Sequence, residues 1–358
     1  MRYIHLLACF LYLLNIRAQE EDSVVLKPEF GMELTSELQL THEKRVNFVN
    51  LLRLYANVPL SNVLSMEAAS ISTCMTSKES IGDDIQTFSN IDAGNIIFAL
   101  SKFGLNWDIN DNHSLFLGIR NMNEDYFVSP VTSLFTNSSC GIFPTISASF
   151  PIANYPFAAV GAHYRYEIMS EETGRNEQKG FAFQSSIYNG IGYNRFYGRE
   201  NIFRVCPRGD GVFGLLQLEY QQRGSCYFLG ACGHYGDLSD DGRRQFGSSV
   251  WAYAEQCITD RLSIITAYSH AFASVPVCTD FAGIGAKYSW NKCELGVFSD
   301  YGRFAEGGEC ATEVTCKVLL SRHVYLQPTA HFIISPITEQ EKENKFLSVG
   351  MLRVGVAF

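Results

Sequence analysis

The residues best suited to chemistry are charged and hydrogen-bonding side chains that gather in one short stretch. Arg120 is followed within six residues by two amides, two carboxylates and a phenol, and further arginines occur in two later segments. Arginine presents a rigid fork of donors, and carboxylates supply acceptors, so together they can bind a neutral molecule rich in hydroxyl groups. The candidate site residues are Arg120, Asn123, Glu124, Asp125, Tyr126, Arg165 and Arg353.

Two other kinds of chemistry have weaker support. A serine hydrolase needs a Ser–His pair with an orienting third residue, yet nothing in the sequence assigns a serine to His163 or His331, and Gly-x-Ser-x-Gly is absent. Ten cysteines follow residue 18, without CxxC or zinc-ligand spacing. Cys226–Cys232 and Cys310–Cys316 are candidates for local disulfides, and free buried thiols are the alternative. We therefore expect no enzyme, metal or cofactor.

Composition narrows the class of protein. The 358 residues include 28 Lys plus Arg and 37 Asp plus Glu, a net charge of −9 that argues against a nucleic-acid binder. Charged residues make up only 18% and aromatic residues 13%. After the first 20 residues the sequence has no uncharged apolar run of 18 or more, which excludes membrane-spanning helices. A secreted all-β protein and a membrane β-barrel remain.

The first 18 residues are expected to be an export signal. Arg2 precedes a short apolar stretch, His5 to Leu14, and Ala18 is a suitable last residue before cleavage. This pattern is typical of a secretory signal peptide. Residues 19–358 would then form one domain.

Strand signals recur along nearly the whole chain, with turn residues between them. They average roughly ten residues, the length that crosses a bilayer at a tilt. The sixteen expected strands are Phe30–Leu40, Val46–Ala56, Val63–Thr73, Asn95–Asp108, Ser114–Asn121, Pro156–Ile168, Gly180–Tyr188, Val212–Gln222, Ser225–Tyr235, Ser249–Cys257, Arg261–His270, Asp280–Ser289, Lys292–Tyr301, Glu313–Leu320, His323–Ile333 and Phe346–Phe358.

The connections alternate in length. Links from even to odd strands are short, except Ser170–Lys179, whereas links from odd to even strands are mostly longer. Short turns on one side and long loops on the other are typical of outer-membrane barrels, and a soluble sandwich has no reason to sort its loops in this way. An even strand count places both termini on the short-turn, periplasmic side.

Alternation within strands supports a polar lumen and an apolar outer face. The strand near residue 160 places Ala158, Val160 and Ala162 opposite His163 and Arg165, whereas Trp251–Cys257 alternates poorly. The expected lumen residues are Arg53, Lys102, Arg120, His163, Arg165, Glu219, Lys287, Gln327, His331 and Arg353. Many such charges could pair simply to make the barrel rigid.

Sixteen strands enclose a water-filled channel, whereas eight are filled by side chains. The longest connection, Met122–Tyr155, mixes aromatic, polar and proline residues. We expect it to fold into the lumen and narrow it.

Several motifs resemble the carbohydrate-selective porin family (OprB type). The resemblance rests on Gly118–Phe127, Asn137–Pro144 and Pro151–Pro156, and on Tyr325–Pro328 and Leu352–Phe358 near the C-terminus. It covers about Asn95 to His163 and the last 35 or so residues, and the middle matches by strand count alone. The chain departs from the family in looking shorter and in its ten cysteines.

The resemblance implies a sixteen-stranded all-β barrel in the outer membrane of a Gram-negative bacterium that passes small sugars down their gradient. Its implied partners are small sugars, outer-membrane lipids and the barrel-assembly machinery, which recognises a terminal residue such as Phe358. A general diffusion porin and a structural or adhesive barrel are the alternatives. The sequence indicates neither the solute nor the oligomeric state.

Overall fold

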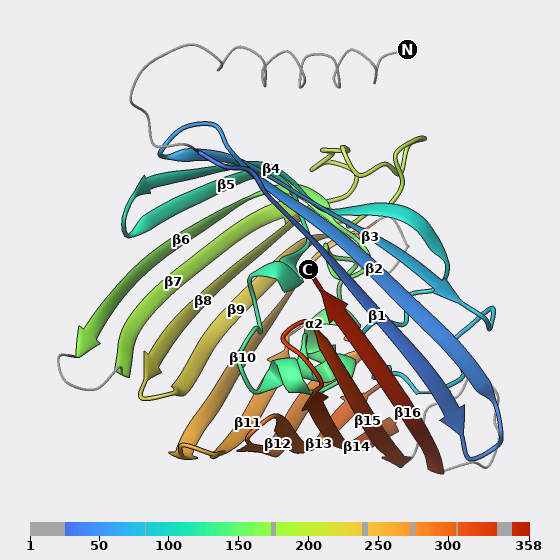
Figure 1. Ribbon diagram of the computed structural model, residues 1–358. Coiled ribbons are helices and arrows are strands. Elements are labelled where there is room, and N and C mark those ends of the chain that lie inside the picture. Colours follow the sequence, from blue (N-terminus) through green and yellow to red (C-terminus); the bar gives the residue numbers. More distant parts are fainter. Residues whose placement is uncertain are drawn as a thin grey trace.

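The chain forms a closed barrel of sixteen antiparallel strands, as predicted, in the computed structural model (Figure 1). The structure describes residues 26–82, 84–172, 177–237, 243–272, 276–305, 307–334 and 346–358, so the expected signal peptide lies outside it. The strands are β1 Glu29–Thr41, β2 Val46–Pro59, β3 Leu64–Met75, β4 Ile96–Asn110, β5 His113–Arg120, β6 Ala159–Glu172, β7 Glu177–Asn189, β8 Val212–Gln222, β9 Ser225–Asp237, β10 Arg244–Thr259, β11 Leu262–Ala271, β12 Cys278–Trp290, β13 Cys293–Phe304, β14 Gly307–Leu319, β15 Val324–Ile334 and β16 Phe346–Ala357.

Pairing of the first strand with the last closes the barrel. β1 and β16 lie side by side, with Leu38 opposite Leu352 and Thr35 opposite Gly355 (Figure 1). Met32 and Phe358 exchange backbone hydrogen bonds of 3.1 and 2.9 Å at the end of this seam. Closure leaves no strand edge unpaired, which a bilayer requires.

The sixth link differs from the sequence-based expectation. β6 continues to Glu172 and β7 begins at Glu177, so this connection is not the long exception that Ser170–Lys179 suggested. Backbone pairing continues beyond the expected strand ends, with Ser170 opposite Lys179 and Glu172 opposite Glu177. The sorting of links by length is therefore more regular than the sequence indicated.

Each strand places alternate side chains on opposite faces of the barrel wall. Leu34, Leu54, Leu218 and Leu352 are exposed on the outer face, whereas the residues between them are mostly buried on the inner face. The poor alternation of β10 has a simple cause. Its inward side chains, Trp251 and Tyr253, are themselves large and apolar and are buried inside the barrel.

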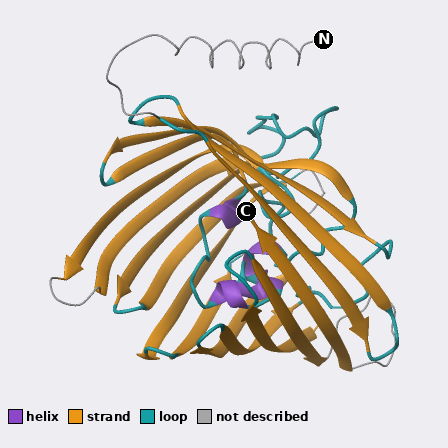
Figure 2. Ribbon diagram, in the orientation of Figure 1, coloured by secondary structure: helices purple, strands orange, loops and turns teal. Residues whose placement is uncertain are grey.

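The residues between β5 and β6, here called the inner segment (residues 122–155), contact the inner face of the wall. Four short helical turns shape it: η1 Met122–Glu124, η2 Thr132–Leu134, η3 Ser138–Cys140 and α2 Pro144–Ser147. Figure 2 shows these turns surrounded by strands. The inner segment bonds to inward side chains from β2 at one end to β14 and β15 further along.

The two local disulfides suggested by spacing are wrong. Cys226 and Cys232 lie on β9, and Cys310 and Cys316 lie on β14. Six residues of strand span about 20 Å, far beyond the Cα separation that a disulfide allows. All ten described cysteines are free thiols.

Within the described ranges, no helix is both long and apolar enough to cross a membrane.

Candidate functional site

The centre of the candidate site is the turn where β5 passes into the inner segment. The Arg120 guanidinium, at the end of β5, binds both carboxylate oxygens of Asp125. It also lies 3.8 Å from the Glu67 carboxylate of β3 and 4.5 Å from the Phe116 ring centre. The asparagine before η1, Asn121, accepts a hydrogen bond from the Asn123 amide and so fixes the turn.

Glu124 extends this network to neighbouring strands. Its two carboxylate oxygens lie 2.7 and 2.6 Å from the Arg53 guanidinium of β2, and Lys102 of β4 lies 3.8 Å away. Lys102 also pairs with Glu67 at 3.1 Å. The Arg53 side chain is 33% exposed, so this part of the wall faces water.

Arg165 lies further along the same wall, on β6. It pairs with Glu167 at 2.8 Å and with Glu219 of β8 at 3.3 Å. The side chains of Arg165 and Glu167 are 27% and 35% exposed. We call the charged side chains that pair with one another on the inner side of β2 to β6 the charged face. Its members are Arg53, Glu67, Lys102, Arg120, Glu124, Asp125, Arg165 and Glu167.

Two predicted site residues have roles within the inner segment. The Asn123 side-chain oxygen accepts a 3.0 Å hydrogen bond from the Tyr155 amide, which ties the two ends of the segment together. Tyr126 is buried, and its hydroxyl lies 2.9 Å from Ser186 Oγ of β7. Burial raises the pKa of Tyr126, so its hydroxyl remains protonated. Both residues position the segment; Tyr126 is buried, whereas Asn123 is half-buried.

Arg353 is not joined to this cluster in the structure. Its guanidinium binds the buried Glu37 carboxylate of β1 and lies 2.6 Å from Asn90 Oδ1, in the connection between β3 and β4. Both Glu37 and Arg353 are buried. Arg353 therefore secures that connection to the β1–β16 seam.

Sequence reasoning missed a Ser–His–Asp contact. His163 Nδ1 lies 2.8 Å from Ser186 Oγ, and His163 Nε2 lies 3.7 Å from Asp125 Oδ1. Ser186 lies within β7, where the backbone is paired to β6 and β8, and its hydroxyl already contacts Tyr126. Both Ser186 and His163 are buried. The contact is best explained as a tether for the inner segment.

Buried carboxylates of the far wall hold the inner segment and were not predicted. Glu313 of β14 accepts backbone hydrogen bonds of 2.9 to 3.0 Å from Thr136 and Asn137. Asp300 of β13 accepts a 2.8 Å hydrogen bond from the Asn137 amide side chain. Their partners lie 163 or more residues away, so no local pattern could have indicated them.

A related contact holds the connection between β3 and β4. The Ile85 and Gln86 amides donate to Glu309 of β14 at 3.1 and 3.0 Å. Asp84 lies beside them; its Oδ2 accepts from the Phe88 amide at 2.7 Å, but its Oδ1 is shielded from solvent without a partner. Burial and the nearby Glu309 charge raise the pKa of Asp84 to about 7.

A second group of inward side chains packs against the inner segment. Phe143 lies 5.1 Å from Phe281 of β12, Phe127 lies 5.0 Å from Trp251, and Phe135 lies 5.4 Å from Phe298 of β13, between ring centres. We call the wall residues the apolar face; they are Phe213, Leu215, Phe228, Trp251, Tyr253, Ile265, Phe281 and Phe298.

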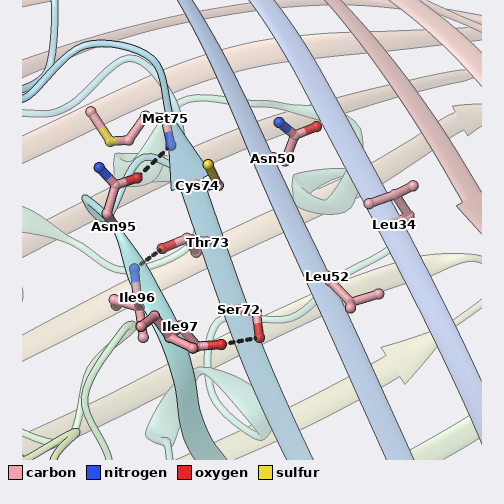
Figure 3. A pocket seen from close by; sticks show the side chains of 10 residues that line it. All are labelled: Leu34, Asn50, Leu52, Ser72, Thr73, Cys74, Met75, Asn95, Ile96 and Ile97. Carbon is pink, nitrogen blue, oxygen red and sulfur yellow. Dashed lines mark hydrogen bonds between the residues drawn. The ribbon is translucent and has the colours of Figure 1, made fainter.

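A groove of about 430 Å³ lies on the outer face, over β1 to β4 (Figure 3). Outward-facing Leu34, Leu52, Ser72 and Ile97 line it, and the Ser72 hydroxyl donates to the Ile97 carbonyl at 2.7 Å. The groove is therefore separate from the charged face inside the barrel. Among the described residues, no group of three or more His, Cys, Asp or Glu could hold a metal ion.

Comparison with solved structures finds the same fold in porins. The high-pH structure of Pseudomonas putida OprB matches with a TM-score of 0.74 and 13% identity, over 92% of this chain and 94% of that chain. The anion-selective porin from Comamonas acidovorans matches with a TM-score of 0.59 and 10% identity, over 93% and 99%.

A loop-deletion mutant of OmpT, an outer membrane protein of Vibrio cholerae, matches with a TM-score of 0.57 and 10% identity, over 93% and 99%. No protein-family model matches the chain, and no curated protein matches it. The expected resemblance to OprB is thus confirmed at the level of the fold.

Proposed function

We propose that this chain is an outer-membrane porin that gives small sugars a preferred passive route through a narrow, water-filled lumen. The observation that carries the proposal is the charged face, whose Arg53, Arg165 and Glu167 side chains are exposed to water inside a closed sixteen-stranded barrel. The proposal places the barrel in the outer membrane of a Gram-negative bacterium, in contact with its lipids and inserted by its barrel-assembly machinery.

The charged face suits neutral, hydroxyl-rich solutes because it is nearly balanced in charge. It contains three arginines, one lysine and four carboxylates, and Glu219 of β8 adds a fifth carboxylate beside Arg165. Donors and acceptors alternate along the wall, so a sugar can exchange water for protein hydrogen bonds at each step. A balanced wall produces no strong field that would favour one sign of ion.

The inner segment is proposed to form the constriction. Its aromatic side chains pack on the apolar face and fill the lumen beside β8 to β13. The proposed path therefore runs beside β2 to β6, where the charged side chains are partly exposed. Its own Glu124 and Asp125 border that path. One segment thus both narrows the lumen and supplies part of its polar lining.

The test is conductance of the purified barrel in planar bilayers while maltodextrins, glucose or amino acids are added. Block by maltodextrins and glucose, but not by amino acids, is the expected result. Large conductance that ignores sugars would indicate a general diffusion pore, and no conductance from a folded barrel would indicate a structural or adhesive role.

Variants locate the sugar path. Arg53→Ala and Glu167→Gln should each weaken sugar block severalfold, whereas Lys317→Gln, an inward cation held over the Tyr325 ring at 4.3 Å on the other side of the barrel, should leave it unchanged. Equal effects of all three would contradict the proposed path.

A further inference from the structure

The turns that the structure describes on one edge of the barrel divide into two arcs of different charge. Even-to-odd links lie at the same edge because neighbouring strands are antiparallel. From β8 to β15, each of these turns carries an exposed cation, whereas the β2–β3 turn (residues 60–63) has no charge and the β4–β5 turn carries Asp111. The cations, here called the basic rim, are Arg223, Arg261, Lys292 and Arg322.

The basic rim is spaced along an arc. Successive members are two strands apart, and strands lie about 4.8 Å apart, so neighbouring cations are roughly 10 Å or more apart along the edge. Of the side chains in these four turns, Asp260 is the one carboxylate. Such an arc matches a row of separate anions better than a single small one.

Exposed apolar and aromatic side chains adjoin the basic rim. Trp290 is 59% exposed, directly before the turn that contains Lys292, and Leu320 and Ile258 are exposed beside Arg322 and Arg261. An aromatic belt marks the boundary between hydrocarbon and headgroups in barrels of this kind. The cations therefore lie at the depth of the lipid headgroups if the barrel spans a bilayer.

We propose that the basic rim binds the anionic headgroups of phospholipids in the periplasmic leaflet. The proposal rests on the proposed membrane location, and it adds a lipid preference confined to the β8–β15 arc. The turns of β2 to β5, which lack cations, should show no such preference. Juxtamembrane Lys and Arg typically enrich anionic lipid on the order of fivefold each, and salt weakens the attraction.

The tryptophans provide a built-in comparison. Trp290 lies at the basic rim, Trp107 lies on β4 near the turn that carries Asp111, and Trp251 is buried inside. In Trp107→Phe protein the lipid-accessible tryptophan is Trp290, and in Trp290→Phe protein it is Trp107. Each variant is reconstituted in phosphatidylcholine vesicles that contain a minor share of one brominated lipid. The brominated lipid is phosphatidylglycerol in one sample and phosphatidylcholine in the other, and quenching of the tryptophan fluorescence is measured in both.

We expect brominated phosphatidylglycerol to quench Trp290 severalfold more than brominated phosphatidylcholine does, and to quench Trp107 equally with either lipid. The triple variant Arg261→Gln, Lys292→Gln and Arg322→Gln should abolish the difference at Trp290, as should high salt. The control pair Arg199→Gln and Arg208→Gln, in the connection between β7 and β8 at the opposite edge, should preserve it.

An equal quenching ratio at Trp290 and Trp107, or a ratio unaffected by the triple variant, would overturn the proposal. Far-ultraviolet circular dichroism establishes that each variant is folded. Planar-bilayer conductance is recorded on the same samples, so a barrel that conducts but shows no lipid preference separates failure of this inference from failure of the porin function.

Discussion

The two halves of the inner wall are built from the same alternating strands, but their inward side chains differ in polarity and in exposure to water. The charged face, on β2 to β6, keeps paired side chains in contact with water, with Arg53 and Glu167 about one-third exposed. The apolar face, on β8 to β13, is sealed by the inner segment, and Trp251 and Phe281 are almost completely buried. One half leaves charged side chains partly exposed to water, and the other is packed like the core of a globular protein.

Under the proposed porin function, this difference means that stability and permeation depend on different residues of the barrel. Packing on the apolar face contributes through burial, which is large for aromatic side chains. The Arg53–Glu124 and Arg165–Glu167 ion pairs of the charged face are partly solvated, so they contribute little to stability. Substitutions in the two halves should therefore affect different measurements.

The largest effect is expected on the apolar face. Trp251→Ala removes an indole that packs on Phe127 and donates to Gln217 at 3.1 Å, and it should destabilise the folded barrel by about 3–5 kcal/mol. Thermal unfolding followed by circular dichroism measures this loss. Val250→Ala, on the outer face of the same strand, is the control, and an equal loss there would contradict the packing argument.

The next effect concerns the carboxylate that holds the inner segment. Glu313→Ala leaves the buried Thr136 and Asn137 amides without their acceptor, at a cost of about 1–3 kcal/mol for each donor that stays unpaired. We expect noisier single-channel currents and faster proteolysis within the inner segment. Glu313→Gln keeps one acceptor oxygen and should show a smaller change; identical behaviour of Ala and Gln would refute this role.

A pH effect should appear at the connection between β3 and β4. The pKa of Asp84 is raised from 3.8 to about 7, so the folded protein holds the proton more tightly than the unfolded chain. Its contribution to stability is therefore complete below pH 4 and is lost as the pH rises toward 7. Glu309 and Asp92 add negative charge nearby.

Hydrogen exchange of residues 84–95 measures this change. Protection in the wild type should fall between pH 4 and 8, whereas Asp84→Asn should keep its protection across that range. Parallel loss in both proteins would show that Asp84 is not the titrating group.

The smallest effect on stability is expected on the charged face. Arg53→Ala should change the free energy of unfolding by about 1 kcal/mol or less, because the Arg53 side chain is one-third exposed. The same variant should alter cation-to-anion selectivity, since it leaves Glu124 with Lys102 as its remaining cation. Reversal potentials under a salt gradient measure the selectivity. A large loss of stability with unchanged selectivity would contradict the assignment of permeation to the charged face and of stability to the apolar face.

The fold was predictable because its signals are local. Alternation with period two and short turn motifs indicated all sixteen strands, and turns such as Arg223-Gly224, with φ of 51° and 73°, suit two-residue hairpins. Alternation failed at Trp251 and Tyr253 because their inner surroundings are apolar. A lumen that is partly filled does not present a polar face on every strand.

The candidate site was predictable only in part. Arg120, Glu124 and Asp125 lie at one turn and Arg165 lies further along the same wall, whereas Arg353 belongs to a separate buried pair and Tyr126 is buried. Glu67 was missed because β3 alternates small and polar residues on both faces. Contacts such as Glu313 with Thr136 join residues 177 positions apart, and no local sequence pattern around either residue predicts the other as its partner.

The seam between β1 and β16 has a consequence for the order of assembly. Glu37 and Arg353 meet across it although 316 residues separate them along the chain. Bringing such distant segments together carries a large loop-closure entropy and is slow. A chain still emerging during synthesis cannot complete this contact, because the last strand is made last. Until β16 is made, one edge of β1 has no β16 partner, and an unpaired strand edge is a template for aggregation.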